Sequence, residues 1–275
     1  SDQVVTNNHM ILNAGQDVNI NQAVIHTSFD NLKVTAANIY MVADSKWNVE
    51  GSASLDVSGD MELAFITVRG DESISLGSGG DAYDFTGLNL QGDNISLNQS
   101  LDLGQTFAPV YTANVQVNAD SEFNIADTND VRLNGSAMIT ATDFIMGADS
   151  IIATGSDLTV NANDIDAGKL YSLNGDIKLT SQTDLDINDD ITTDTDGVIE
   201  LNTVDTLNML AGAEVFSDNT LDVDAGTIAM VTSASLGAHK DVNITSTLGG
   251  MTLGGIDART HLTLSAVDQD IALNS

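Results

Sequence analysis

The sequence predicts an all-β fold, a parallel β-solenoid (β-helix) with three short strands in each coil of about 21 residues. Three observations predict it. Pairs of apolar residues, separated by one mostly polar residue, recur along the chain at a nearly fixed interval. The segments between them are rich in Gly, Asn, Asp, Ser and Thr, which favour turns. Three series of pairs share one period, which indicates one structural unit used repeatedly.

The three series are clearest in the C-terminal hundred residues. The first has steps of 22, 22, 21 and 20 and begins its pairs at Ile177, Ile199, Leu221, Val242 and Leu262. The second has steps of 21, 20, 22, 21, 23 and 20 and runs through Phe144, Ile165, Leu185, Leu207, Ile228, Met251 and Ile271. The third has steps of 19, 21, 24, 21 and 20 and runs through Ile151, Leu170, Ile191, Val215, Leu236 and Ile256.

Each apolar pair predicts a strand of three to five residues, because alternation with period two places both apolar side chains on one face. In Ile177-Lys178-Leu179 the lysine faces outward. The outward position is filled in later coils by Glu200, Asp222, Asn243 and Thr263. A helix is excluded, since residues i and i+2 lie on different sides of a helix.

The same pattern predicts one β-helix over residues 1–275 with roughly 11–13 coils. In the N-terminal part the pairs begin at Val18, Leu32, Ile39, Leu55 and Met61, with looser spacing. Two irregular stretches predict insertions at corners, near residues 77–87 and 105–113. The first is rich in Gly, and the second holds Pro109, which cannot donate a hydrogen bond to a strand ladder.

Composition restricts the partners. The formal net charge is −32, with 40 acidic and 8 basic residues, so we expect no binding to nucleic acid or to anionic membrane surfaces. No apolar run reaches the roughly 20 residues of a membrane-spanning helix. The chain has no Cys, which rules out disulfides and thiol chemistry. Because it begins at Ser1 without Met, we expect a processed product or a fragment.

One acidic stretch is a candidate site for a divalent cation, with calcium as the expected ion, because hard cations take oxygen ligands at turns. Its candidate ligands are Asp184, Asp186, Asn188, Asp190, Asp194 and Asp196. Asp186-x-Asn188-x-Asp190 is similar to the opening of an EF-hand loop. Ile191 then stands where that loop needs glycine, and Gly197 where it needs glutamate. Two interpretations stay open: a solvated acidic face, and loose calcium binding at acidic corners with no required cofactor.

Several segments resemble the coils of filamentous-haemagglutinin-like proteins, which are large bacterial adhesins and exoproteins. They are Ala14-Gly-Gln-Asp-Val-Asn-Ile-Asn, Gly175-Asp-Ile-Lys-Leu-Thr-Ser, Gly226-Thr-Ile-Ala-Met-Val-Thr, Lys240-Asp-Val-Asn-Ile-Thr-Ser and Asp270-Ile-Ala-Leu-Asn. The resemblance covers most of the chain and implies a right-handed β-helix shaft that is exported to the cell surface or the extracellular space. The secretion domain of that family is not recognisable in this sequence.

We therefore expect a non-enzymatic shaft or subunit of an extracellular bacterial filament or adhesin. Its expected partners are further copies stacked end to end, neighbouring shaft segments, and a cell-surface or glycan ligand. Two alternatives remain. One is a polysaccharide lyase or hydrolase, although the abundant carboxylates make no pair distinctive. The other is a calcium-dependent glycan-binding module. His239 and His261 are 22 residues apart, which places them on neighbouring coils, where we expect surface positions.

Overall fold

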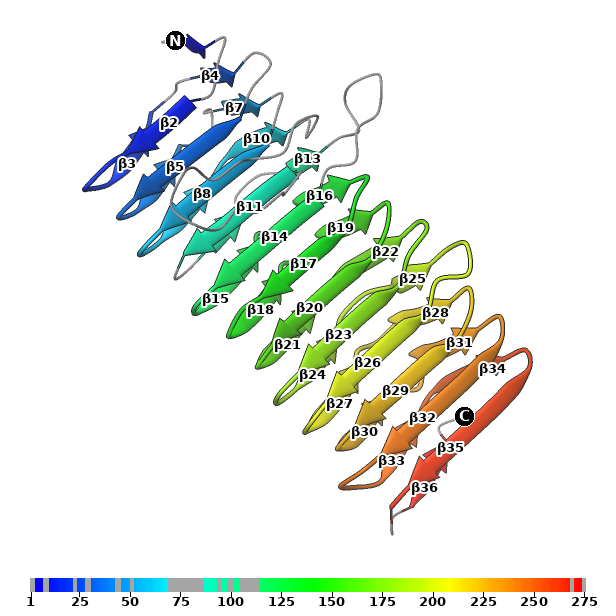
Figure 1. The fold of residues 1–275 in the computed structure, drawn as a ribbon. Helices are drawn as coiled ribbons and strands as arrows, with labels where there is room; N and C mark the ends of the chain where they lie inside the picture. The colour runs from blue at the N-terminus through cyan, green and yellow to red at the C-terminus, as the bar shows by residue number, and fades with distance from the viewer. Residues whose placement is uncertain are drawn as a thin grey trace, which may run out of the picture. The chain divides into compact units, whose positions relative to one another are not determined.

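The computed structural model describes residues 3–6, 10–21, 24–27, 31–42, 46–49, 52–68, 87–92, 95–97, 101–103, 114–267 and 270–273. The chain forms two compact units, Ser1–Ala141 and Thr142–Ser275. In each unit, short strands pair in parallel with the strands of the coils before and after them (Figure 1). The described residues contain strands and no helix, which confirms the predicted all-β solenoid.

Three sheets line each coil, and we refer to them as sheets A, B and C. In the first unit, sheet A contains β1 (Gln3–Thr6), β4 (Val24–Thr27), β7 (Lys46–Val49), β10 (Phe65–Val68), β13 (Leu101–Leu103) and β16 (Asp130–Leu133). Sheet B contains β2 (Met10–Asn13), β5 (Leu32–Ala36), β8 (Ala53–Val57), β11 (Gly87–Gly92), β14 (Asn114–Ala119) and β17 (Ala137–Thr140). Sheet C contains β3 (Val18–Ile20), β6 (Ile39–Met41), β9 (Met61–Leu63), β12 (Ile95–Leu97) and β15 (Glu122–Ile125).

The second unit repeats this order. Its sheet A contains β19 (Ile151–Thr154), β22 (Lys169–Ser172), β25 (Ile191–Thr193), β28 (Glu214–Ser217), β31 (Ser235–Ala238) and β34 (Gly255–Ala258). Sheet B contains β20 (Leu158–Ala162), β23 (Ile177–Ser181), β26 (Ile199–Thr203), β29 (Leu221–Ala225), β32 (Asp241–Ser246) and β35 (His261–Ala266). Sheet C contains β18 (Asp143–Met146), β21 (Asp164–Ala167), β24 (Leu185–Ile187), β27 (Thr206–Met209), β30 (Thr227–Met230), β33 (Met251–Leu253) and β36 (Ile271–Leu273).

The predicted apolar series form columns in the core of the second unit. Phe144 pairs with Ile165, Ile165 with Leu185, and so on to Ile271. The series that begins at Ile177 pairs in register from coil to coil up to Leu262. Neighbouring strands are about 4.8 Å apart, so equivalent apolar residues of successive coils lie one above another. Each coil thereby covers the apolar side chains of the next.

One predicted core position was wrong by one residue. Leu170 pairs with Ile152, while Ile151 pairs with Lys169. Ile152 is buried and Ile151 only partly so. Two adjacent isoleucines leave the alternation ambiguous, and the register with Leu170 decides which of them faces inward.

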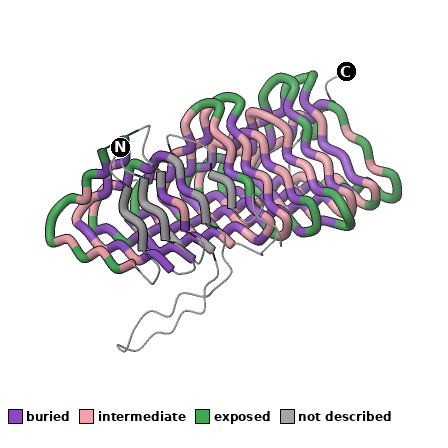
Figure 2. The backbone as a smooth tube through the Cα atoms, turned by 90° about the horizontal axis from the view of Figure 1, so that it is seen from above, coloured by how far each residue is buried: buried purple, intermediate pink, exposed green. Residues whose placement is uncertain are grey.

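Outward positions alternate with these columns along most strands whose burial is described (Figure 2). In sheet B of the second unit, the outward residues Lys178, Glu200, Asp222 and Asn243 stack in one row. Lys178 Nζ lies 2.6 Å from Glu200 Oε2, and Asn243 Nδ2 donates to Asp222 Oδ1 at 2.8 Å. The predicted alternation of inward and outward residues is therefore confirmed here.

The first unit has the same kind of core. Val18, Ile39, Met61, Ile95 and Phe123 pair in register in sheet C. The insertions predicted near 77–87 and 105–113 lie outside the described residues, apart from Gly87 at the start of β11. The single continuous β-helix expected over residues 1–275 stays a prediction.

Candidate functional site

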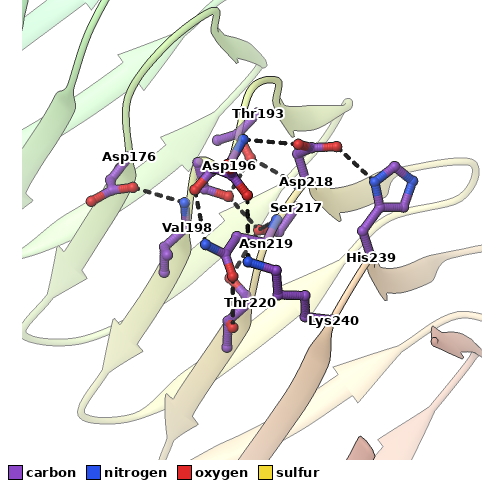
Figure 3. Close-up of polar contacts among 11 residues, drawn as sticks. Asp176, Thr193, Asp196, Val198, Ser217, Asp218, Asn219, Thr220, His239 and Lys240 are labelled. Atoms are coloured by element: carbon purple, nitrogen blue, oxygen red, sulfur yellow. Dashed lines mark hydrogen bonds and ion pairs between the residues drawn. The ribbon is translucent and has the colours of Figure 1, made fainter. Parts of the chain in front are cut away.

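The corners that connect sheet A to sheet B in the second unit carry the densest set of polar contacts among the described residues (Figure 3). The β25–β26 corner spans residues 194–198, the β28–β29 corner 218–220, and the β31–β32 corner 239–240. We call this set of residues the A–B corner cluster. It is the candidate functional site.

Buried hydroxyl groups hold the cluster from inside. The last residue of four sheet A strands is a buried Ser or Thr, namely Thr154, Ser172, Thr193 and Ser217. Ser217 Oγ lies 2.8 Å from the carbonyl oxygens of both Gly197 and Thr220. It also accepts the backbone N–H of Asn219 at 3.2 Å. The side-chain hydroxyl therefore adds hydrogen bonds to backbone groups that already pair with each other across the corner, such as the Asn219 N–H with the Gly197 carbonyl oxygen at 3.1 Å.

The β25–β26 corner is the longest of the three and has an uncommon backbone. Thr195 and Asp196 have φ values of 52° and 64°, a region that β-branched residues rarely adopt. The next residue is Gly197, where a Cβ atom would lie 2.5 Å from the carbonyl oxygen of Gly175 on the preceding coil. Only glycine fits there. Neighbouring coils must therefore hold this corner in place.

Asp218 is one of the residues that hold the β25–β26 corner in place. Its Oδ2 accepts the backbone N–H of Asp196 at 2.8 Å, and its Oδ1 lies 2.6 Å from Nδ1 of His239. The pKa of Asp218 is lowered below its ordinary value, first by the hydrogen bond from the Asp196 backbone and further by His239 and Lys240. Asp218 is therefore a carboxylate at neutral pH, and it contacts residues of the coils before and after its own.

Two further contacts reach the same corner. Lys240 Nζ lies 3.4 Å from Asp196 Oδ1, although the two residues are 44 positions apart in the sequence. Both side chains are more than half exposed, so water screens this ion pair and its stabilisation is small. Asn219 Nδ2 donates to the carbonyl oxygen of Asp196 at 3.0 Å. The corner thus receives hydrogen bonds from two later coils.

On the preceding coil, Tyr171 donates its hydroxyl hydrogen to Asp194 Oδ2 at 2.7 Å. This hydrogen bond, with partial burial and the negative charge of Asp194, raises the pKa of Tyr171 to about 12. The phenol stays neutral and keeps donating throughout the physiological pH range. It orders the first residue of the strained corner.

The structure distributes the six predicted cation ligands over four places. Asp184 lies in a corner between sheets B and C, where Oδ1 accepts the backbone N–H of Thr206. Asp186 lies on the outward side of β24 and accepts Nδ2 of Asn208 at 2.7 Å. Asn188 and Asp190 lie between β24 and β25, where Asn188 donates to Asp166 and Asp190 lies 3.6 Å from Lys169 Nζ. Asp194 and Asp196 belong to the A–B corner cluster.

These six residues do not form one cluster, and the described residues hold no group of three or more His, Asp or Glu placed to bind a metal ion. Calcium binding by this stretch therefore stays a prediction, at separate corners rather than at one centre. Asp166 and Asp186 lie directly opposite each other in sheet C. Burial, opposed by the hydrogen bond from Asn188 and supported by Asp186, raises the pKa of Asp166.

His239 and His261 lie at the surface on neighbouring coils, as their spacing predicts. His239 lies in the A–B corner cluster, while His261 is the first residue of β35 and lies beside Asp241 of β32. His261 Nδ1 lies 2.9 Å from Asp241 Oδ1. Each histidine therefore pairs with an aspartate of the preceding coil, and His239 also packs its ring edge against Phe216.

The comparisons with known proteins give no relative. No helix among the described residues is long and apolar enough to cross a membrane. No family model matches the chain, and no curated protein or solved structure matches it. The chain is a β-solenoid repeat protein by the register of its own strands.

Proposed function

We propose that this protein is a structural shaft segment of an extracellular bacterial filament or adhesin, exported to the cell surface, with no catalytic role. One observation carries the proposal. Within each unit a described coil is sealed by the coil that pairs with it in register, and a coil without such a partner exposes its core positions.

The contrast is large within each column. Leu262 is 48% exposed, and its partner Val242 in β32 is 0% exposed. Leu273 is 67% exposed, and its partner Leu253 is 0% exposed. Exposed apolar columns beside unpaired strand edges favour the addition of another coil, whether from the same polypeptide or from a neighbouring subunit. Continued stacking in one direction builds a fibre.

Self-association of the 275-residue chain tests the proposal. Purified protein is imaged by negative-stain electron microscopy and measured by analytical ultracentrifugation over a wide range of concentrations. We expect rods whose length increases with concentration. Leu273→Asp places a charge on the open coil and should stop the growth, because a buried unpaired charge is strongly unfavourable.

Leu210→Asp is the matched control. Leu210 is 49% exposed but lies in a corner between sheets C and A, away from the open strand edges of β34–β36. Rods should form as in the unmodified protein. A single small species at every concentration would contradict the proposal, and so would rods that Leu273→Asp leaves unchanged.

A further inference from the structure

Two aromatic side chains share one outward row of sheet A in the second unit. Tyr171 of β22 pairs with Thr192 of β25, and Thr192 pairs with Phe216 of β28. Since neighbouring strands are about 4.8 Å apart, the two aromatic positions are about 10 Å apart with one threonine between them. This separation is similar to the repeat of an extended disaccharide.

The position of Phe216 is fixed by its neighbours on the next coil. A Cβ atom at Gly237 would lie 2.9 Å from Cδ2 of Phe216, so the ring occupies the space that a side chain at position 237 would need. The ring of His239 meets Phe216 edge-on, with centroids 4.9 Å apart and an interplanar angle of 83°. Phe216 therefore leans toward β31 and away from Thr192.

Tyr171 is fixed at the other end by its hydrogen bond to Asp194. Both rings are partly exposed, so each is held in one orientation and still offers apolar surface to solvent. Ordered, partly exposed aromatic rings can bind a ligand with little loss of side-chain entropy.

Polar groups border the row on both sides. Asp194, Asp218 and His239 of the A–B corner cluster follow the ends of the sheet A strands, and Lys169, Asp190 and Glu214 lie at their beginnings. Carboxylates accept hydrogen bonds from hydroxyl groups, while the apolar C–H face of a sugar ring packs on an aromatic ring. The excess of carboxylates repels an anionic ligand, and a neutral sugar offers the C–H face and the hydroxyl groups that these rings and carboxylates can bind.

We propose that the Tyr171–Thr192–Phe216 row binds a neutral glycan, with one sugar ring over Thr192 and the hydroxyl groups directed to Asp194, Asp218 and His239. No metal ion takes part. This inference deepens the adhesin proposal, on which it rests, by placing a ligand surface on the side of the shaft, apart from the open coil that mediates stacking.

Affinity electrophoresis tests it. The 275-residue chain is run in native gels that contain hydroxyethyl cellulose, galactomannan or a soluble β-glucan, with alginate as an anionic control and with EDTA throughout. We expect retardation by at least one neutral polysaccharide and none by alginate. Tyr171→Ala should weaken that retardation about tenfold, because it removes one stacking surface. Thr192→Trp should abolish the retardation, because the indole ring would occupy the space over position 192 where we place the sugar ring.

Tyr40→Ala is the matched control, because Tyr40 also faces outward from a short strand but shares its row with Asn19 and Glu62 and no second ring. Its retardation should equal that of the unmodified chain, and circular dichroism melting confirms that each variant is folded. No retardation by any of the three neutral polysaccharides would overturn the inference, as would retardation that survives both Tyr171→Ala and Thr192→Trp. Rod formation is measured separately. Rods without retardation by a polysaccharide would therefore contradict the glycan-binding inference but not the proposed shaft function.

Discussion

The Asp218 carboxylate lies 2.6 Å from His239 through one oxygen and accepts the backbone N–H of Asp196 through the other. These three residues belong to three successive coils. One side chain thereby links the strained corner at residues 194–198 to two later windings of the chain. Its protonation state controls how firmly this corner is held.

Asp218→Asn should lower the melting temperature at pH 7. The folded state lowers the pKa of Asp218 below its ordinary value of 3.8, so its stabilising contribution is fully present above that value. The contribution is lost as the pH falls through the lower folded pKa. We therefore expect the gap between unmodified and variant proteins to narrow as the pH falls below 3.8, and to close only below the folded pKa, where Asp218 is neutral in both states. Melting curves from pH 7 to pH 3 check this, and a gap independent of pH would contradict it.

Asp166→Asn should have the opposite effect on stability at pH 7. The pKa of Asp166 is raised, so its carboxyl favours folding below its ordinary value of 3.8 and loses that contribution as the pH rises through the folded pKa. At pH 7 the variant should be more stable by roughly 0.2–1 kcal/mol, because it removes a partly buried charge and, with it, the like-charge pair with Asp186. Asn208→Asp adds a third carboxylate to the same row and should be destabilising. Urea unfolding of both variants measures the two shifts, and equal signs would refute the pairing.

Core substitutions should depend on their place in a column. Leu207 and Ile271 belong to the same sheet C column, but Leu207 is 0% and Ile271 is 42% exposed. Leu207→Ala should cost about 2–5 kcal/mol, the usual cost of a large cavity. Ile271→Ala should cost less than about 1 kcal/mol in the dispersed protein, since little burial is lost. Similar costs for the two variants in urea unfolding would show that the open coil is covered.

The buried corner hydroxyls should be individually important. Ser217→Ala removes one donor from the carbonyl oxygens of Gly197 and Thr220, which keep their backbone N–H donors, so the cost should be about 0.5–1.5 kcal/mol. Ser217→Thr is the control, because Thr193 fills the corresponding position one coil earlier. It should retain most of the stability. Hydrogen exchange at residues 193–220 checks the local effect, and unchanged protection in Ser217→Ala would argue against this role.

Salt and calcium should raise the melting temperature. A chain of net charge −32 repels itself, and at 0.1 M salt the screening length falls to about 10 Å. Loose binding of calcium at separate acidic corners should add to the effect of sodium chloride at equal ionic strength. Identical melting curves in low salt, high salt, calcium and chelator would contradict both expectations.

The columns of the core could be predicted because two sequence patterns must agree. One is the alternation of apolar residues within a strand, and the other is the repeat length from coil to coil. Phe144, Ile165 and Leu185 lie at steps of 21 and 20 residues, and only stacking in register buries all three. Ile151 was misassigned since its neighbour is equally apolar. The sequence also contained a signal for the corner hydroxyls, in the small second inward residue of Leu170-Tyr171-Ser172 and Val215-Phe216-Ser217.

The A–B corner cluster could be predicted only in part. The step of 24 between Ile191 and Val215 indicates extra residues, but it does not say which of three corners receives them. The six acidic candidates were grouped by closeness in sequence. In a solenoid, residues four apart can occupy different corners, while Asp196 and Lys240, 44 positions apart, lie side by side.

The columns of buried serine and threonine at the strand ends have an evolutionary consequence. Ser172 and Thr193 pair in register, and both close a corner through their hydroxyl groups. Because four successive windings each contribute such a hydroxyl at the same place, a gene could gain or lose one of them by duplication or deletion and still encode a sealed core. Lengths within a lineage should therefore differ by whole multiples of about 21 residues.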